Sequence, residues 1–76
     1  MTLEKIRKEI DEIDIEIQDL LEKRFSLVLQ ALKYKKKVLD KKREEEILNK
    51  ISSPYIRDIF KTILKTSKKK QRLHFN

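Results

Sequence analysis

Arg24 carries a charge at a position where the surrounding pattern predicts an apolar side chain. It lies between Leu20 and Leu27 on a stripe of apolar residues that recurs every three or four positions, which is the spacing of a helix seam. A guanidinium on such a face is costly to bury unless it is paired. Three interpretations are open: the side chain extends to solvent, pairs with a structural carboxylate, or binds an anion.

Lys35 and Arg7 are the cations that an anion site would combine with Arg24. Lys35 follows Arg24 by eleven residues, about 16 Å along a helix backbone, and the two long side chains can grip one small dianion across Ala31. Arg7 precedes Arg24 by seventeen residues, about 25 Å along a straight helix. One small ligand cannot touch both arginines of one chain, so Arg7 either serves a partner's site or pairs with surface carboxylates.

Polar residues also occupy apolar positions in the second half of the chain. Arg43 and Glu44 stand together ahead of Ile47; such a pair can hold one another and a ligand hydroxyl, although charges are common in a first helical turn. At helical spacing, Ser67 and Gln71 continue an apolar stripe made of Ile56, Phe60, Ile63 and Leu64. A Gln donates and accepts hydrogen bonds without charge; the alternative is a helix that leaves the core here.

The residue types exclude several kinds of chemistry. The chain has no Cys and a single His, His74, so it offers neither a thiolate metal site nor a nucleophile paired with a His base. We therefore expect no metal and no covalent step. Any reaction would depend on positioning and on electrostatic stabilisation.

Three helices are expected to position these side chains, over residues 2–36, 40–51 and 54–71, with residues 72–76 frayed. Thr2, Asp40 and Ser53 are suited to be N-caps, and Pro54 fits the first turn of the third helix. The chain has no Gly, and Pro54 is its single proline, so tight hairpin turns have little to build on. We expect an all-α fold in a single domain over residues 1–76.

The first predicted helix is too long for a small globule. It would measure about 50 Å, whereas a compact chain of this length has a radius of gyration of about 11 Å. A second copy is the simplest cover for its seam, so we expect a homodimer; a purely structural coiled coil is an alternative. The seam consists of Leu3, Ile6, Ile10, Ile13, Ile17, Leu20, Leu27 and Ala31.

The net charge of the chain is +7, which can attract small anions or nucleic acid. The lysines of residues 33–37 and 68–70 suit non-specific phosphate contacts. No recognition-helix motif or aromatic platform accompanies them, so nucleic acid is the alternative and not the expected partner. No apolar run is long enough to span a bilayer, and the first residues lack a signal-peptide core. The expected location is therefore the cytoplasm, away from membranes.

Together these residues resemble the all-helical, or type II, chorismate mutases, in particular the small dimeric prokaryotic type. The resemblance covers Leu3 to Gln71, nearly the whole chain. The run Asp40-Lys41-Lys42-Arg43-Glu44 matches the family's Asp-x-x-Arg-Glu. The order and spacing of this run and four further segments carry the resemblance: Leu3–Asp14, Leu20–Arg24, Lys33–Lys35, and Ile59-Phe60 with Ser67 and Gln71.

The resemblance implies an intertwined helical homodimer that rearranges chorismate to prephenate without a cofactor. It implies that Arg24, and Arg7 from the other subunit, hold the two substrate carboxylates. Lys35 and Gln71 would donate hydrogen bonds to the ether oxygen, where negative charge grows. A lyase that removes pyruvate from isochorismate on the same fold is the alternative, although this set of residues favours the mutase.

The same resemblance assigns the remaining site residues. Glu44 and the backbone near Asp40 would hold the ring hydroxyl, Arg43 would line the site, and Ser67 would lie near a carboxylate. Four residues separate Lys35 from Asp40, where the family usually has a longer loop that closes over the substrate. The implied apolar walls are Val28, Ala31, Ile47 and Leu64.

Overall fold

The computed structural model describes residues 1–35 and 40–75, and the side chains of residues 35 and 75 lie outside this description. It contains three helices, α1 (Leu3–Lys35), α2 (Lys41–Asn49) and α3 (Pro54–Phe75). The predicted all-α fold is confirmed, since no described residue belongs to a strand. Within the described ranges, no helix is long and apolar enough to cross a membrane.

Each helix begins at a side-chain cap that the sequence predicts. Three side-chain oxygens accept a hydrogen bond from the backbone N–H three residues further on: those of Thr2 at 3.2 Å, Asp40 at 3.1 Å and Ser53 at 3.3 Å. Such a bond satisfies one of the N–H groups that lack a partner in the first turn of a helix. Local chemistry therefore fixes where all three helices start.

The ends of the helices differ from the prediction. Helix α2 ends at Asn49 rather than residue 51, because the chain tightens there into bonds from each N–H to the carbonyl three residues back, at Lys50 and Ile51. Helix α3 continues to Phe75, so residues 72–75 are helical instead of frayed. The rings of His74 and Phe25 meet edge to face with centroids 6.2 Å apart, and Arg72 and His74 complement the helix dipole. The predicted end of the first helix at residue 36 lies outside the described residues.

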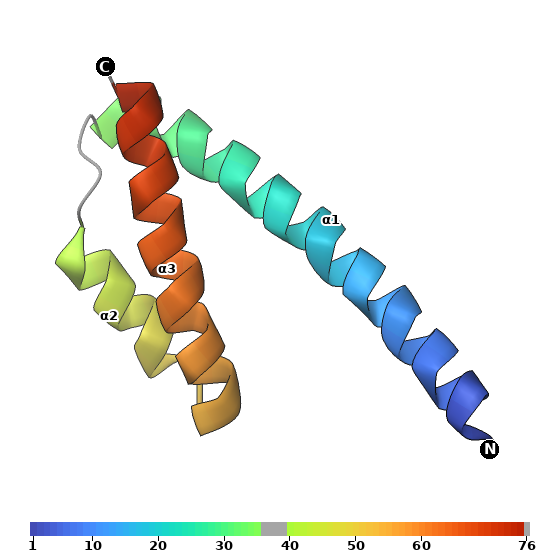
Figure 1. Cartoon of the computed structure of the whole chain (residues 1–76). Helices are drawn as coiled ribbons and strands as arrows, with labels where there is room; N and C mark the ends of the chain where they lie inside the picture. The colour runs from blue at the N-terminus through green and yellow to red at the C-terminus, as the bar shows by residue number, and fades with distance from the viewer. Residues whose placement is uncertain (36–39, 76) are drawn as a thin grey trace.

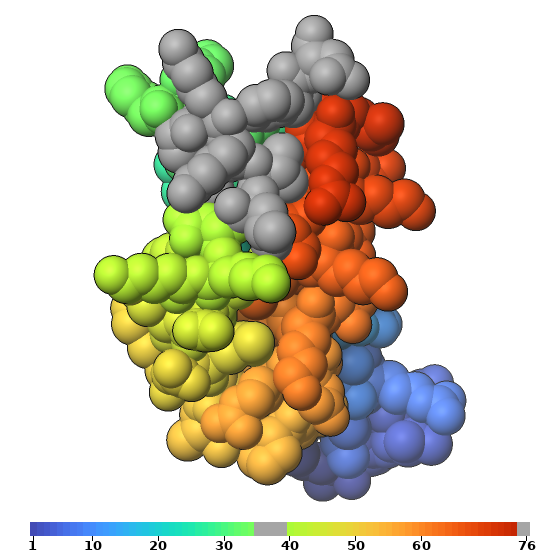
Figure 2. Space-filling model, turned by 90° about the vertical axis from the view of Figure 1, so that its left-hand side faces the viewer, coloured from blue at the N-terminus to red at the C-terminus, as the bar shows by residue number. Residues whose placement is uncertain are grey.

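Helix α3 is the element that the other two share. It packs against α1 and against α2, and Figure 1 shows the first half of α1 running away from both. The molecule extends 50 Å along its longest axis and has a radius of gyration of 15.4 Å, well above the value of about 11 Å for a compact chain of this length. Figure 2 shows α2 and α3 side by side, with the N-terminal part of α1 protruding behind them.

The apolar interior of the described chain is very small. Leu32 and Leu64, each 7% exposed, are its only buried apolar side chains. The predicted seam of α1 is open to solvent over most of its length in the single chain. Its exposed large residues are Leu3, Ile6, Ile10, Ile13, Ile17, Leu20 and Leu27.

Because Leu32 is one of two buried apolar anchors, Leu32→Ala should lower the free energy of unfolding by about 2–5 kcal/mol. Tyr34→Ala is the matched control two residues away, since Tyr34 is 88% exposed; its effect should stay within about 0.5 kcal/mol. Urea unfolding followed by circular dichroism at one protein concentration measures both. Equal losses in the two variants would contradict the assignment of Leu32 to the core.

Candidate functional site

One pocket lies where the three helices meet, and we call it the site pocket. It encloses about 350 Å³, within the range of pockets that hold small ligands. Its wall combines cations, carboxylates, an amide and a hydroxyl with an apolar lining. The lining residues are Arg24, Leu27, Val28, Ala31, Asp40, Arg43, Glu44, Ile47, Leu64, Ser67, Lys68 and Gln71.

Six of the eight predicted site residues line this pocket, namely Arg24, Asp40, Arg43, Glu44, Ser67 and Gln71. The four predicted apolar wall residues line it as well. Lys35 ends helix α1, but its side chain lies outside the described part. Arg7 is exposed and does not line the pocket, because it belongs to the part of α1 that diverges from α3 (Figure 1).

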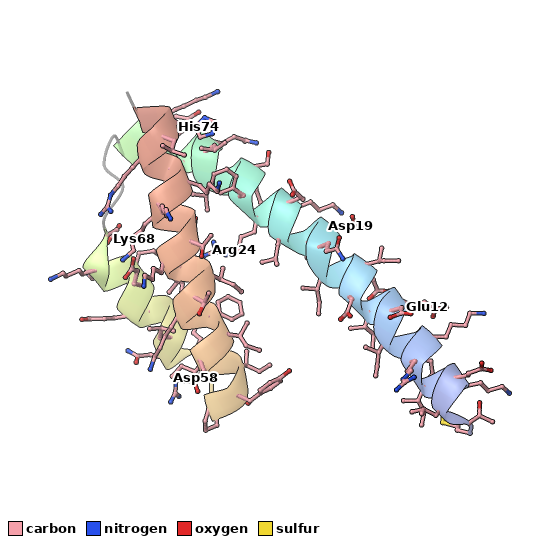
Figure 3. All side chains as sticks on the ribbon, viewed as in Figure 1. Glu12, Asp19, Arg24, Asp58, Lys68 and His74 are labelled. Carbon is pink, nitrogen blue, oxygen red and sulfur yellow. The ribbon has the colours of Figure 1, made fainter. Side chains whose placement is uncertain are left out.

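The guanidinium of Arg24 is half-buried in this wall. Burial and, second, the positive charge of Arg43 lower the pKa of Arg24 below its usual value. Both effects disfavour the cation, and the negative charge of an anion between the two arginines would offset the second of them. Figure 3 shows Arg24 and Lys68 in the region where the helices converge, whereas Glu12 and Asp19 lie on the diverging part of α1. This charge arrangement suits an anionic ligand.

Glu44 pairs with a lysine of another helix and not with its sequence neighbour Arg43. The Nζ atom of Lys68 lies 3.1 Å from Oε2 of Glu44 and 3.4 Å from Oε1. Arg43 instead contacts Glu46 one turn on, at 3.6 Å and largely in solvent. Adjacent residues on a helix point in different directions, so Arg43 and Glu44 pair with different residues and not with one another.

Lys68 is the polar residue of this pocket that sequence reasoning missed. It was grouped with Lys69 and Lys70 as a basic run, although Lys69 and Lys70 are exposed and Lys68 is half-buried. The signal was its spacing, since Lys68 lies four residues after Leu64 and three before Gln71. Residues at these intervals share one helix face.

Ser67 and Gln71 are the two buried polar side chains of the described chain, at 8% and 4% exposure. The Nε2 atom of Gln71 donates to the Oγ atom of Ser67 at 3.1 Å. Within the described residues, Oε1 of Gln71 is buried without a hydrogen-bond partner. A half-turn of the amide exchanges its two ends: the Ser67 hydroxyl then donates to Oε1, and Nε2 is left to donate to a ligand. Either way, one end of a buried amide is available in the pocket.

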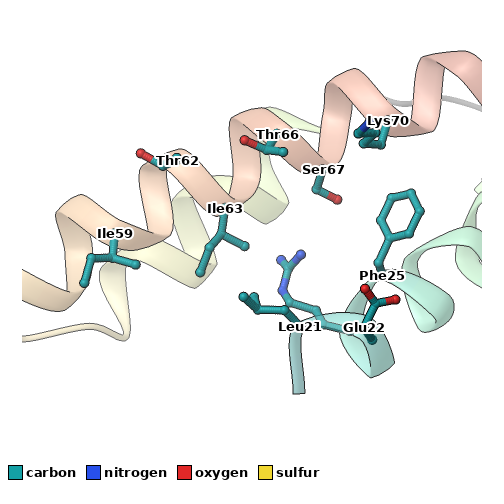
Figure 4. Close-up of a pocket in the computed structure, with 10 residues that line it drawn as sticks. Leu21, Glu22, Phe25, Ile59, Thr62, Ile63, Thr66, Ser67 and Lys70 are labelled. Atoms are coloured by element: carbon teal, nitrogen blue, oxygen red, sulfur yellow. The ribbon is translucent and has the colours of Figure 1, made fainter. Parts of the chain in front are cut away.

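A second, larger hollow of about 610 Å³ lies between α1 and α3, and we call it the apolar groove. Figure 4 shows Leu21 and Phe25 of α1 facing Ile63 and Ser67 of α3 across it. Most of the predicted polar site residues do not line it, so size alone does not make it the site. Its lining consists of Leu21, Glu22, Arg24, Phe25, Ile59, Thr62, Ile63, Thr66, Ser67 and Lys70.

The described residues of the site pocket can bind and orient an anion, and none of them is a nucleophile paired with an adjacent base. In the described ranges, no three His, Asp or Glu side chains gather closely enough to hold a metal ion. The pocket can fix the conformation of a ligand, balance its negative charge and donate hydrogen bonds to an oxygen. These are the requirements of a reaction that proceeds by positioning and electrostatics.

A model of the family described as chorismate mutase type II matches residues 6–72 of the chain. This range contains nearly all of the described structure and all eight predicted site residues. The comparisons with curated proteins and with solved structures found no significant match.

A buried amide with an unused end is expected in a binding site and is unfavourable for stability alone. Gln71→Met should therefore leave the free energy of unfolding unchanged or raise it by about 1 kcal/mol, because the unpaired buried acceptor disappears. Leu64→Met is the control, since it also introduces Met at a buried position of the same helix. It should lower the free energy of unfolding by less than about 1.5 kcal/mol. A loss above about 2 kcal/mol for Gln71→Met in urea unfolding would make the amide a structural group instead.

Proposed function

The chain belongs to the all-helical type II chorismate mutase family, and we propose that it rearranges chorismate to prephenate in the site pocket. Members of this family are isomerases, and the family implies a place in aromatic amino-acid biosynthesis. The convergence of Arg24, Glu44, Ser67 and Gln71 on one pocket is the observation that carries the assignment to this site. These residues come from all three helices, and the resemblance assigns each of them a contact with the substrate.

The reaction breaks the ether C–O bond and forms a C–C bond within one molecule, so it exchanges no proton, water or leaving group with the protein. The pocket has to hold a compact reactive conformer and stabilise the oxygen that gains charge. In this proposal Arg24 binds a carboxylate. Gln71 and Lys35 donate to the ether oxygen, and Glu44 accepts from the ring hydroxyl.

We further propose that two copies form a homodimer and that each supplies Arg7 to the other's pocket. The seam of α1 is exposed in the single chain, and the apolar groove offers a surface of matching chemistry beside Arg24. If α1 of each copy packs against the apolar groove of the other, the seam and the groove are buried together. This is the self-complementary arrangement of a two-fold dimer. Arg7, about 25 Å from Arg24 along α1, is then placed by the partner. A cytoplasmic location belongs to the same proposal.

The activity is tested by incubating the purified protein with chorismate and following the loss of its absorbance. Lys35→Ala and Gln71→Ala should each lower kcat/KM by about 10²–10³, since each removes a donor to the oxygen that gains charge. Lys33→Ala and Gln30→Ala remove the same groups from exposed positions on α1 and should retain activity.

An inactive wild-type protein would contradict the mutase assignment. Release of pyruvate from isochorismate, in the absence of prephenate formation, would favour the lyase. If the protein binds nucleic acid with an affinity that falls steeply with salt and is unchanged by Gln71→Ala, the alternative of a nucleic-acid-binding protein would be favoured.

The shared site is tested by mixing subunits. Arg7→Ala and Arg24→Ala homodimers should both be nearly inactive, while a mixed dimer contains one pocket with both arginines. Random exchange of equal amounts of the two variants should therefore restore about a quarter of the wild-type activity. A mixture that forms mixed dimers yet stays inactive, or a protein that sediments as a monomer under assay conditions, would overturn this account of Arg7.

A further inference from the structure

Lys68 is placed to act on the proposed substrate through Glu44. Its ammonium group contacts both carboxylate oxygens of Glu44, at 3.1 and 3.4 Å. The two side chains are 25% and 24% exposed, and both residues line the site pocket. The pair joins α2 to α3, so its geometry sets where the Glu44 carboxylate stands relative to Ser67 and Gln71.

We propose that Lys68 is a positioning residue of the site, which holds the Glu44 carboxylate in place for the ring hydroxyl of the substrate. This inference rests on the proposed function. A Glu side chain has several freely rotating bonds, and holding it in one rotamer before the ligand arrives removes an entropic cost from binding. An ammonium that bridges both oxygens still leaves each of them a lone pair for a hydroxyl donor.

Lys68 also makes the charge of the described pocket wall net positive. The other charged side chains that line it in the described structure are the cations Arg24 and Arg43 and the carboxylates Asp40 and Glu44, which balance. With Lys68 the described wall is net positive, as a dianionic ligand requires. Without it, the unpaired Glu44 carboxylate would repel the ligand.

The neighbouring lysine provides a matched control. Lys69 follows Lys68 on the same helix and is exposed, outside both pockets. Lys68→Met and Lys69→Met remove the same charge and keep a long side chain. A general effect of net charge on substrate attraction changes both variants alike, whereas the proposed contact concerns Lys68 alone.

In steady-state assays with chorismate, Lys68→Met should raise KM about tenfold and change kcat less than about twofold, because the contact with the hydroxyl persists from bound substrate to transition state. Lys68→Arg should restore most of the affinity, since it returns a cation to the same carboxylate. Lys69→Met should stay within about twofold of wild type.

The decisive measurement is a double-mutant cycle with Glu44→Gln. If Lys68 acts through Glu44, Lys68→Met adds little to the rise in KM that Glu44→Gln already causes. Additive effects, equal behaviour of Lys68→Met and Lys69→Met, or a loss of helix content that accounts for the change would each overturn the inference. An active wild type with such a result leaves the mutase assignment intact, whereas an inactive wild type removes both.

Discussion

Charged and polar groups occupy the space between the three helices, where a chain of this size would otherwise place its apolar core. The two most deeply buried polar side chains, Ser67 and Gln71, are on the same helix face as Leu64, one of two buried apolar residues. Desolvating such groups costs free energy unless partners satisfy them. The polar residues of α3 therefore favour ligand binding and reduce the apolar core of the single chain. The stabilising apolar contacts must come from other surfaces.

The apolar surface that would compensate is present but unused within one chain. The first half of α1 carries its large apolar side chains in solvent, and the molecule is elongated as a result. In the proposed homodimer, a second copy covers this surface and also supplies Arg7 to the pocket. Stability and site completion then have one structural cause, since both require the length of α1.

Local features were predictable from the sequence, and contacts between helices were not. The helix starts could be predicted from Thr2, Asp40 and Ser53, because each cap side chain accepts a hydrogen bond from a backbone N–H only three residues further on. Most residues of the pocket could be predicted, because helical spacing and the family resemblance place the same residues on the inner helix faces. The partner of Glu44 could not, because nothing in the sequence gives the distance between α2 and α3 or distinguishes Lys68 within its run. The length of α3 was underestimated for a similar reason: the ring contact of His74 is with another helix.

The ion pair between Glu44 and Lys68 makes the attachment of α2 sensitive to the medium. A quarter of each side chain meets solvent, so dissolved ions weaken the pair, with a Debye length of about 8 Å at physiological ionic strength. Heating acts in the opposite direction, because the cost of dehydrating charged groups falls as temperature rises. Helix α2 has no buried residue, and this pair is an ion pair that joins it to α3. Added salt thus weakens the contribution of this pair to the attachment of α2, and heating strengthens that one contribution.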